Sequence, residues 1–409
     1  MAKYLLTSML LLILSAANAQ FKITGKIISA DNKKPIASAS VFFSNTSKGS
    51  TTNDVGEFII ENMADGRYDL VASCIGYETY VQQVIPSTIS GALTIELKPK
   101  IAELDEVVVG GYTKEGWKIW GKFFMDNFIG QTPYATNCTI KNTEAIQFRN
   151  YKKQHLIKAF SDETLIIENK SLGYILRYRL ELFQFDFVSR ILFYQGYPLF
   201  EKMETSRSRK TNRWAENREK AYYGSELHFM RSLFRNKLVT DGFEIRKQLK
   251  VANKEKQRVK ALYASRRFIK KVDNTVSVHT RDLFSDSSAY YENILRQPDE
   301  KDIVFPELLP SDSIAYAVNK TTAGLDFSDY LRITYTKSIE ESDYLFQFHL
   351  ERKPMAPVSL ITLNNKKPVE ILANGLYYNS MDLLTTGYWA WSEKIANMLP
   401  FDYWPEKKQ

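Results

Sequence analysis

The chain has 409 residues and a net charge of +8, and 44% of its residues are hydrophobic. This length predicts two or three domains, and two cysteines exclude a disulfide framework. The positive charge is uneven: residues 201–271 hold 21 Lys and Arg against 8 Asp and Glu, whereas residues 272–409 hold 13 against 20.

The first residues predict export. A basic start at Met1–Tyr4 precedes the apolar run Leu5–Leu14, and Ala17-Asn18-Ala19 fits the small-x-small cleavage rule, which places the mature start at Gln20. The apolar run is shorter than the roughly 20 residues of a membrane-spanning helix. We therefore expect residues 1–19 to be a signal peptide and the protein to lie in the periplasm or at the outer membrane. An uncleaved membrane anchor is the alternative.

Residues 20–98 predict a seven-stranded β-sandwich. Short apolar runs recur at roughly eight-to-twelve-residue intervals with turn residues between them. Phe21–Ile27 alternates between apolar and polar side chains, and Asp65-Gly66 is a hairpin signal. Tyr68 follows this signal as in a tyrosine corner, in which the hydroxyl group binds the backbone at a strand end.

This region resembles the carboxypeptidase-regulatory-like domain, a transthyretin-like sandwich found at the N-termini of exported proteins of Bacteroidota-type bacteria. The resemblance rests on the combined spacing of a few positions: Gly25, Pro35, Asn53-Asp54-Val55-Gly56, Gly66-Arg67-Tyr68 and Gly76-Tyr77. It implies a portable docking or folding module and does not imply a reaction.

Residues 99–116 predict a tether. The run Ala102–Tyr112 resembles the segment that joins the same domain to the plug of TonB-dependent outer-membrane transporters. In that family the corresponding stretch is the energy-coupling box, which pairs as an added strand with a TonB-type partner; here it is Asp105, Glu106, Val107, Val108 and Val109. Only 297 residues follow Tyr112, too few for a plug and a 22-stranded barrel. A plain extended linker or an edge strand is the alternative.

Residues 117–409 predict a larger β-rich (α+β) domain with a helical insertion near 211–238. The aromatic residues of Trp117–Ile129 fall near helical spacing, which predicts a short helix. Tyr174–Phe187 is the clearest strand, because alternate residues are apolar. Its last aromatic residues switch to the opposite face, which indicates that this end is buried on that face.

The second half of this domain has four weaker signals. Ser225 is a suitable helix N-cap before an apolar stripe at helical spacing. The charged stretch Lys247–Lys260 predicts a hairpin tip or an exposed helix. Residues 283–312 contain three prolines and predict a loop with one short helix. Near the end, Ser392–Met398 predicts a helix with Ser392 as its N-cap.

Three stretches of this domain resemble a family of exported, uncharacterised Bacteroidota proteins that carry the same N-terminal domain: Leu165–Tyr174, Gly224–Leu233 and Gly387–Tyr403. This resemblance implies relatives and no activity.

No motif for catalysis is present in the sequence. The four histidines, 155, 228, 279 and 349, do not pair at the spacing of a zinc peptidase site, which excludes that activity. Nucleophile elbows and phosphate loops are absent. The carboxylate pairs Glu340-Glu341 and Asp299-Glu300 predict solvated charges. We therefore expect no enzyme, no cofactor and no metal site.

One basic segment stands out around Trp214: Arg207, Arg209, Lys210, Arg213 and Arg218. Because export is expected, nucleic acid is not an expected partner, and the anionic membrane surface is the available polyanion. A solvated helix face is the alternative.

Two features remain open. Cys74 and Cys138 form a disulfide or stay free. The aromatic cluster at residues 377–404 seals the domain core or forms a stacking platform for a sugar or a protein.

Three functions are compatible with this sequence. The first is a non-enzymatic cell-envelope protein whose sandwich is a docking module. The second is an accessory of TonB-linked transport that uses the Asp105–Val109 strand. The third is a hydrolase with an unrecognised site.

Overall fold

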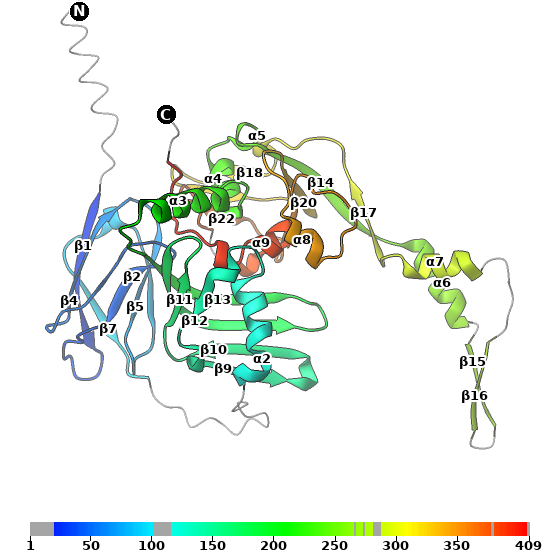
Figure 1. Cartoon of the computed structure of the whole chain (residues 1–409), viewed down its shortest axis with the longest axis horizontal. Coiled ribbons are helices and arrows are strands. Elements are labelled where there is room, and N and C mark those ends of the chain that lie inside the picture. The colour runs from blue at the N-terminus through cyan, green and yellow to red at the C-terminus, as the bar shows by residue number, and fades with distance from the viewer. Residues whose placement is uncertain are drawn as a thin grey trace, which may run out of the picture.

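The computed structural model of the chain describes residues 20–100, 116–265, 267–272, 275–280, 288–377 and 380–406. The predicted signal peptide and the tether strand Asp105–Val109 lie outside these ranges. Figure 1 shows a sandwich at one side, a central body beside it, and an arm that extends from the body.

The N-terminal region is a sandwich of two sheets. Its strands are β1 (Phe21–Ser29), β2 (Ser40–Phe43), β3 (Gly49–Thr51), β4 (Glu57–Met63), β5 (Tyr68–Ser73), β6 (Tyr80–Val84) and β7 (Leu93–Leu97). The strand orders are β4-β1-β7 and β3-β2-β5-β6, and both sheets contribute side chains to one core. Alternate residues of β1, such as Ile23 and Ile27, enter that core because strand side chains alternate between faces. The predicted seven-stranded sandwich is confirmed.

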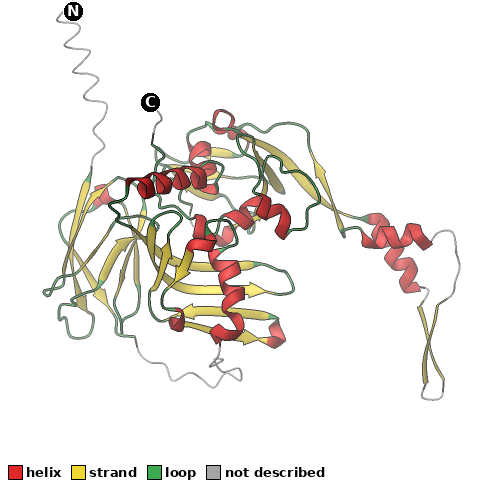
Figure 2. Ribbon diagram, in the orientation of Figure 1, coloured by secondary structure: helices red, strands yellow, loops and turns green. Residues whose placement is uncertain are grey.

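A six-stranded antiparallel sheet forms the first part of the body. Its strands are β8 (Cys138–Ile140), β9 (Ile146–Tyr151), β10 (Leu156–Ser161), β11 (Leu165–Asn169), β12 (Tyr174–Asp186) and β13 (Leu192–Lys202). The order is β8-β11-β12-β10-β9, and β13 pairs with the other side of β12. Helix α2 (Gly116–Phe124) and a π-helical turn, η2 (Met125–Ile129), lie across this sheet (Figure 2). The helix predicted at Trp117–Ile129 is therefore confirmed.

A β-bulge in β12 keeps Phe183 on the face that the earlier apolar residues of the strand occupy. The pairing of β12 with β13 shifts register between Leu180 and Leu182. The extra residue turns Phe183 to the face that already holds Tyr178 and Leu180, and all three side chains are buried. The ring of Phe183 packs at a tilt against the ring of Phe124 in α2, with ring centroids 4.9 Å apart. Phe183 is thus buried on the original face, whereas Phe185 is half-buried and Phe187 is 40% exposed, so the expected second buried face was wrong.

Three helices follow β13: α3 (Ser208–Tyr222), α4 (Glu226–Phe234) and α5 (Leu238–Asp241). They occupy the region where the sequence predicts a helical insertion. Ser225 is the N-cap of α4, as predicted, and its Oγ accepts a hydrogen bond of 3.0 Å from the His228 amide. The apolar side of α4 enters a second core with Phe229, Met230 and Leu233.

Two further sheets complete the body. The five-stranded sheet has the order β17-β14-β20-β21-β23, with β14 (Phe243–Ala252), β17 (Glu300–Val304), β20 (Tyr330–Tyr335), β21 (Val358–Leu363) and β23 (Leu383–Gly387). The three-stranded sheet has the order β18-β19-β22, with β18 (Ala315–Ala317), β19 (Thr322–Leu325) and β22 (Val369–Leu372). The short helix α8 (Ser342–Gln347) connects β20 to β21, and the short helix α9 (Tyr388–Ser392) follows β23.

The arm consists of four elements between β14 and β17: α6 (Lys254–Ser265), β15 (Arg267–Val272), β16 (Thr275–Thr280) and α7 (Ser288–Arg296). It extends away from both the sandwich and the body (Figure 1). The charged stretch Lys247–Lys260 therefore spans the end of a strand and an exposed helix. Residues 283–312 hold both α7 and β17, so this segment is more regular than the prolines indicated.

The helix predicted at Ser392–Met398 is wrong in its start. Helix α9 ends at Ser392, and a separate 3₁₀ turn follows at Ile395–Asn397. Helix α9 starts directly after Gly387, whose φ of +77° favours glycine. The Trp389 amide donates to Ser359 Oγ at 3.0 Å, which holds the first turn against β21.

Candidate functional site

The sandwich docks on the body through the turn between β2 and β3, residues 44–47, which we call the docked turn. The Asn45 amide donates to the Pro198 carbonyl on β13 at 2.8 Å, and the Phe401 amide donates to the Asn45 carbonyl at 2.7 Å. The Phe200 amide donates to the Thr46 carbonyl at 3.0 Å. The backbone of the docked turn is therefore paired on one side with β13 and on the other with residues 400–406, which we call the C-terminal segment.

Apolar packing supports this backbone pairing. The side chains of Phe42 in β2 and Val71 in β5 point away from the sandwich core and pack on Leu199 of β13. All three are buried. Their chain neighbours Phe43 and Leu70 point the other way, into the sandwich core. Because strand side chains alternate, this sheet buries both faces, one in its own core and one against the body.

Polar contacts surround the junction. Tyr68 was expected to bind backbone as a tyrosine corner, but its hydroxyl group forms a hydrogen bond with the Asn374 side chain of the body. Asn374 lies in a hairpin turn of the body, so the tyrosine connects two regions instead of closing its own strand. Further contacts across the junction are the pairs Ser47–Asp402, Arg67–Glu370, Thr79–Arg179 and Lys100–Asp162.

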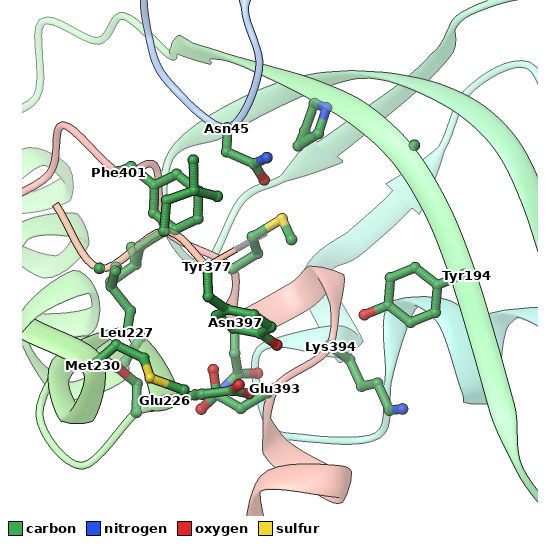
Figure 3. A pocket seen from close by; sticks show the side chains of 18 of the residues that line it. Asn45, Tyr194, Glu226, Leu227, Met230, Tyr377, Glu393, Lys394, Asn397 and Phe401 are labelled. Atoms are coloured by element: carbon green, nitrogen blue, oxygen red, sulfur yellow. The ribbon is translucent and has the colours of Figure 1, made fainter. Parts of the chain in front are cut away.

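A cavity of about 350 Å³ lies where the sandwich, β13, α4 and the C-terminal segment meet; we call it the junction cavity. Asn45, Pro198 and Phe401 line it at the docked turn. Glu226 and Glu393 line it too, and they lie next to each other at the far side from Asn45 (Figure 3). The sandwich therefore completes the wall of a cavity whose polar groups come from the body.

The carboxyl groups of Glu226 and Glu393 share one hydrogen-bond network. The Glu226 amide, in the first turn of α4, donates to the Glu393 carboxyl group, and Ser392 Oγ donates to Glu393 Oε1 at 3.4 Å. The Tyr377 hydroxyl group is hydrogen-bonded to the Glu226 carboxyl group. Glu226 Oε1 is buried and has no hydrogen-bond partner among the described residues.

Burial controls the protonation of this pair. Burial, together with the smaller effect of the neighbouring Glu226 charge, raises the pKa of Glu393 to about 8. Burial also raises the pKa of Glu226, against the opposing hydrogen bond from Tyr377. The Glu393 carboxyl group is therefore mostly protonated at neutral pH.

Lys394 lines the same cavity but faces another way. Its Nζ lies 5.9 Å from the ring centroid of Tyr194, and burial lowers its pKa to about 8. Figure 3 shows its side chain extending away from the two glutamates. The lysine therefore does not neutralise Glu226 or Glu393 in this arrangement.

Only part of the predicted polyanion patch is exposed to solvent. Four of its five side chains are exposed on α3 or directly before it: Arg207, Arg209, Lys210 and Arg213. The fifth, Arg218, donates to the carbonyls of Leu172 and Gly173 at 2.7 and 3.0 Å and lies 4.1 Å from the Tyr174 ring centroid. Arg218 thus holds the turn before β12.

The aromatic cluster mainly seals the core. Trp389 and Trp391 are buried, and their indole nitrogens donate to the Gly224 carbonyl and to Gln347 Oε1 at 2.8 and 2.7 Å. Trp404 is 47% exposed and stacks on the guanidinium group of Arg231, 3.9 Å from its ring centroid.

The structure also places the two cysteines, Glu340 and His228. Cys74 and Cys138 are free thiols, which answers the open question of a disulfide. Glu340 is buried against Arg352 in a bidentate pair, so the expectation of a solvated charge was wrong there. His228 is buried, and burial lowers its pKa to about 4.

Two searches of the described ranges are negative. Within them, no group of three or more His, Cys, Asp or Glu side chains has the arrangement of a metal site. No helix in these ranges combines the length and apolar character that crossing a membrane requires.

Comparisons with known proteins identify the N-terminal region. Residues 23–109 match the family model of the CarboxypepD_reg-like domain, which confirms the resemblance found in the sequence. A TonB-dependent receptor of Formosa agariphila is 36% identical over 98 residues, which is 24% of this chain. The chain spans only 9% of the length of that curated relative. Both matches fit an envelope-associated module.

Solved structures add little for the body. A Bacteroides fragilis protein of unknown function is 11% identical, with 86% of this chain and 93% of that chain covered and a TM-score of 0.17. A cohesin–X-dockerin complex of Acetivibrio cellulolyticus is 21% identical, with 19% of this chain and 58% of that chain covered and a TM-score of 0.16. Likenesses this weak assign neither fold nor function.

Sequence reasoning missed Glu226 and Glu393. Glu226 follows a helix N-cap, where acidic residues are common because they favour the helix dipole. Glu393 lies just past the short helix α9 among aromatic residues. Neither position carries a spacing signal, because the two are 167 residues apart and meet only through the fold.

Proposed function

We propose that this protein is an exported cell-envelope binding protein whose sandwich docks within its own chain and closes a ligand cavity. The observation that carries the proposal is the docked turn, which inserts between β13 and the C-terminal segment and places Asn45 in the cavity wall. The partner of the docking module is thus the body of the same chain.

The junction cavity has the character of a small-molecule site. Ligand pockets combine mostly apolar walls with a few convergent polar groups and occur where domains meet. Leu227, Met230 and Tyr377 supply such walls here, and the two glutamates supply the polar groups. Groups with strongly raised pKa values concentrate at functional sites, which supports the same proposal.

A charge placed in the junction tests the docking. Val71→Lys puts an ammonium group against Leu199, whereas Ile59→Lys on β4 changes a residue that is 51% exposed. We expect Val71→Lys to separate the sandwich from the body and to increase the maximum dimension in small-angle X-ray scattering. Ile59→Lys should scatter like wild type. Identical scattering by all three proteins would show that the sandwich does not depend on this contact.

A second candidate function is an accessory role in TonB-linked transport. It is supported by the 98-residue match to a TonB-dependent receptor and by a family match that extends to residue 109. In this proposal the strand Asp105–Val109, which lies outside the described residues, adds to a sheet of a TonB-type partner.

A pull-down with a purified TonB C-terminal domain tests the second candidate. Val108→Pro removes an amide donor that strand addition needs, so its recovery should fall to background. Ala102→Pro lies outside the strand and should bind like wild type. Equal recovery of both variants, or no recovery of wild type, would exclude this role.

A further inference from the structure

We infer that the junction cavity binds a small organic amine whose ammonium group lies between the carboxyl groups of Glu226 and Glu393. This inference rests on the proposed function, that the cavity is a ligand site. It names the class of ligand from the charges and surfaces that the cavity presents.

The geometry offers an acceptor without a donor. Glu226 Oε1 is buried, lines the cavity side of α4 and receives no hydrogen bond from the described residues. A buried acceptor without a partner costs about 1–3 kcal/mol, and more when the group is charged. An ammonium group supplies up to three donors, enough for Glu226 Oε1 and for a Glu393 oxygen beside it.

The charges favour a cation. Within the described part of the chain, no Lys, Arg or His forms an ion pair with either glutamate. The titratable groups that face them are Tyr377 after β22, Tyr194 of β13, Tyr388 of α9 and Lys394. The tyrosines are neutral at physiological pH, because burial and neighbouring carboxylates raise their pKa values. Lys394 lies against Tyr194, so the pair keeps an uncompensated negative potential when ionised.

The walls favour an organic cation over a metal ion. Ca²⁺ takes six to eight oxygen ligands and Mg²⁺ six, whereas this cavity presents aliphatic and aromatic side chains around two carboxyl groups. Leu227, Met230 and Phe401 can pack on the hydrocarbon part of an amine, and tyrosine rings attract its charge. The cavity volume of about 350 Å³ fits a small ligand.

Proton linkage distinguishes an amine from a neutral polyol. Glu393 is mostly protonated at pH 7 because its pKa is raised to about 8. A bound cation stabilises the ionised carboxylate, so binding at pH 7 must release a proton to the buffer. At pH 9 the carboxyl group is already ionised, and little proton release remains. A sugar hydroxyl group has no charge and produces no such release.

Titration calorimetry with matched probes tests the inference. The probes are 2-phenylethylamine, its neutral isostere 2-phenylethanol, and glucose, each measured with the full mature chain at pH 7 and pH 9. Two buffers of different ionisation enthalpy report the protons released. The variants are Glu226→Gln, Glu393→Gln and Lys394→Met, with the exposed Glu78→Gln as control.

We expect the amine to bind at least tenfold more tightly than the alcohol, with proton release at pH 7 that falls at pH 9. Each glutamine variant should weaken the amine at least tenfold, Lys394→Met should tighten it by removing a like charge, and Glu78→Gln should have no effect. Thermal melts identify any variant that does not fold. In that case the pH dependence of proton release on amine binding by the wild-type chain still tests the inference.

Two results would overturn the inference in different ways. If the alcohol or glucose binds as tightly as the amine, or if the glutamine variants keep full amine affinity, the ligand is neutral and the binding function stands. If none of the three probes binds wild type, the amine is wrong and the binding function loses its support as well.

Discussion

Glu393 shows how one buried carboxyl group makes the stability of the whole chain depend on pH. Its folded pKa of about 8 lies above the ordinary value of 4.5. Between these two values the folded state therefore binds more protons than the unfolded state. The contribution of Glu393 to the stability of the folded chain is fully present below pH 4.5 and is lost as pH rises through 8.

The variant Glu393→Gln isolates this contribution, because an amide resembles the protonated acid and does not titrate. We expect the variant to be more stable than wild type by roughly 2–4 kcal/mol above pH 8 and by much less near pH 4.5. Urea unfolding of both proteins at several pH values measures the difference. Taking the difference cancels other groups such as His228, whose lowered pKa acts in the opposite direction below pH 6.5. If the difference in unfolding free energy between the two proteins does not change with pH, Glu393 is ionised throughout.

At the residue scale the sequence predicts local roles well and tertiary roles poorly. Ser225 was predicted as an N-cap, because capping depends on neighbours three residues away. Glu340 was expected in water, yet it is buried against Arg352 twelve residues later. Glu226 and Glu393 depend on contacts across almost half the chain, which no local pattern encodes.

At the element scale, the C-terminal segment depends on Arg231 of α4. The guanidinium group is fully buried and donates to the carbonyls of Asn374, Phe401 and Tyr403 at 2.8, 2.9 and 2.8 Å. The carbonyls of Phe401 and Tyr403 belong to the same segment that pairs with the docked turn, and Asn374 lies in the hairpin turn after β22. The planar donor fork of arginine suits three acceptors in fixed positions, which a lysine cannot reproduce.

We expect Arg231→Lys to destabilise the chain by about 3 kcal/mol, since two buried carbonyls lose their donor. The exposed Arg209→Lys on α3 is the matched control and should change stability by less than about 0.5 kcal/mol. Denaturant midpoints measure both effects. Equal midpoints for the two variants would show that the guanidinium contacts contribute little.

Elements with strong periodicity were predictable, and their irregularities were not. The strand at Tyr174–Phe187 follows from alternation, but the bulge after Leu180 lies between the part of β12 that pairs with β11 and the part that pairs with β10. The terminal helix was placed four residues too late, because the contact of Trp389 with β21 sets its start and a capping serine does not. Tertiary contacts decide both details.

At the scale of the whole molecule, the sequence predicts the sandwich and its character as a docking module. Its strands have clear alternation and turn residues, and the family match confirms the domain, whereas the docking role stays a prediction. The partner of the docking surface was not predictable. Phe42 and Val71 look like ordinary strand residues in sequence, and their outward direction matters only beside Leu199.

Hydrogen exchange of the junction amides tests most directly the central claim that the sandwich docks within its own chain. The amides of Asn45, Phe200 and Phe401 bridge the two regions, so peptides covering residues 44–47 and 400–403 should exchange slowly in wild type. In Val71→Lys both peptides should exchange fast, while peptides of the sandwich core keep their protection. Fast exchange of both peptides in the wild-type chain would contradict the docked arrangement.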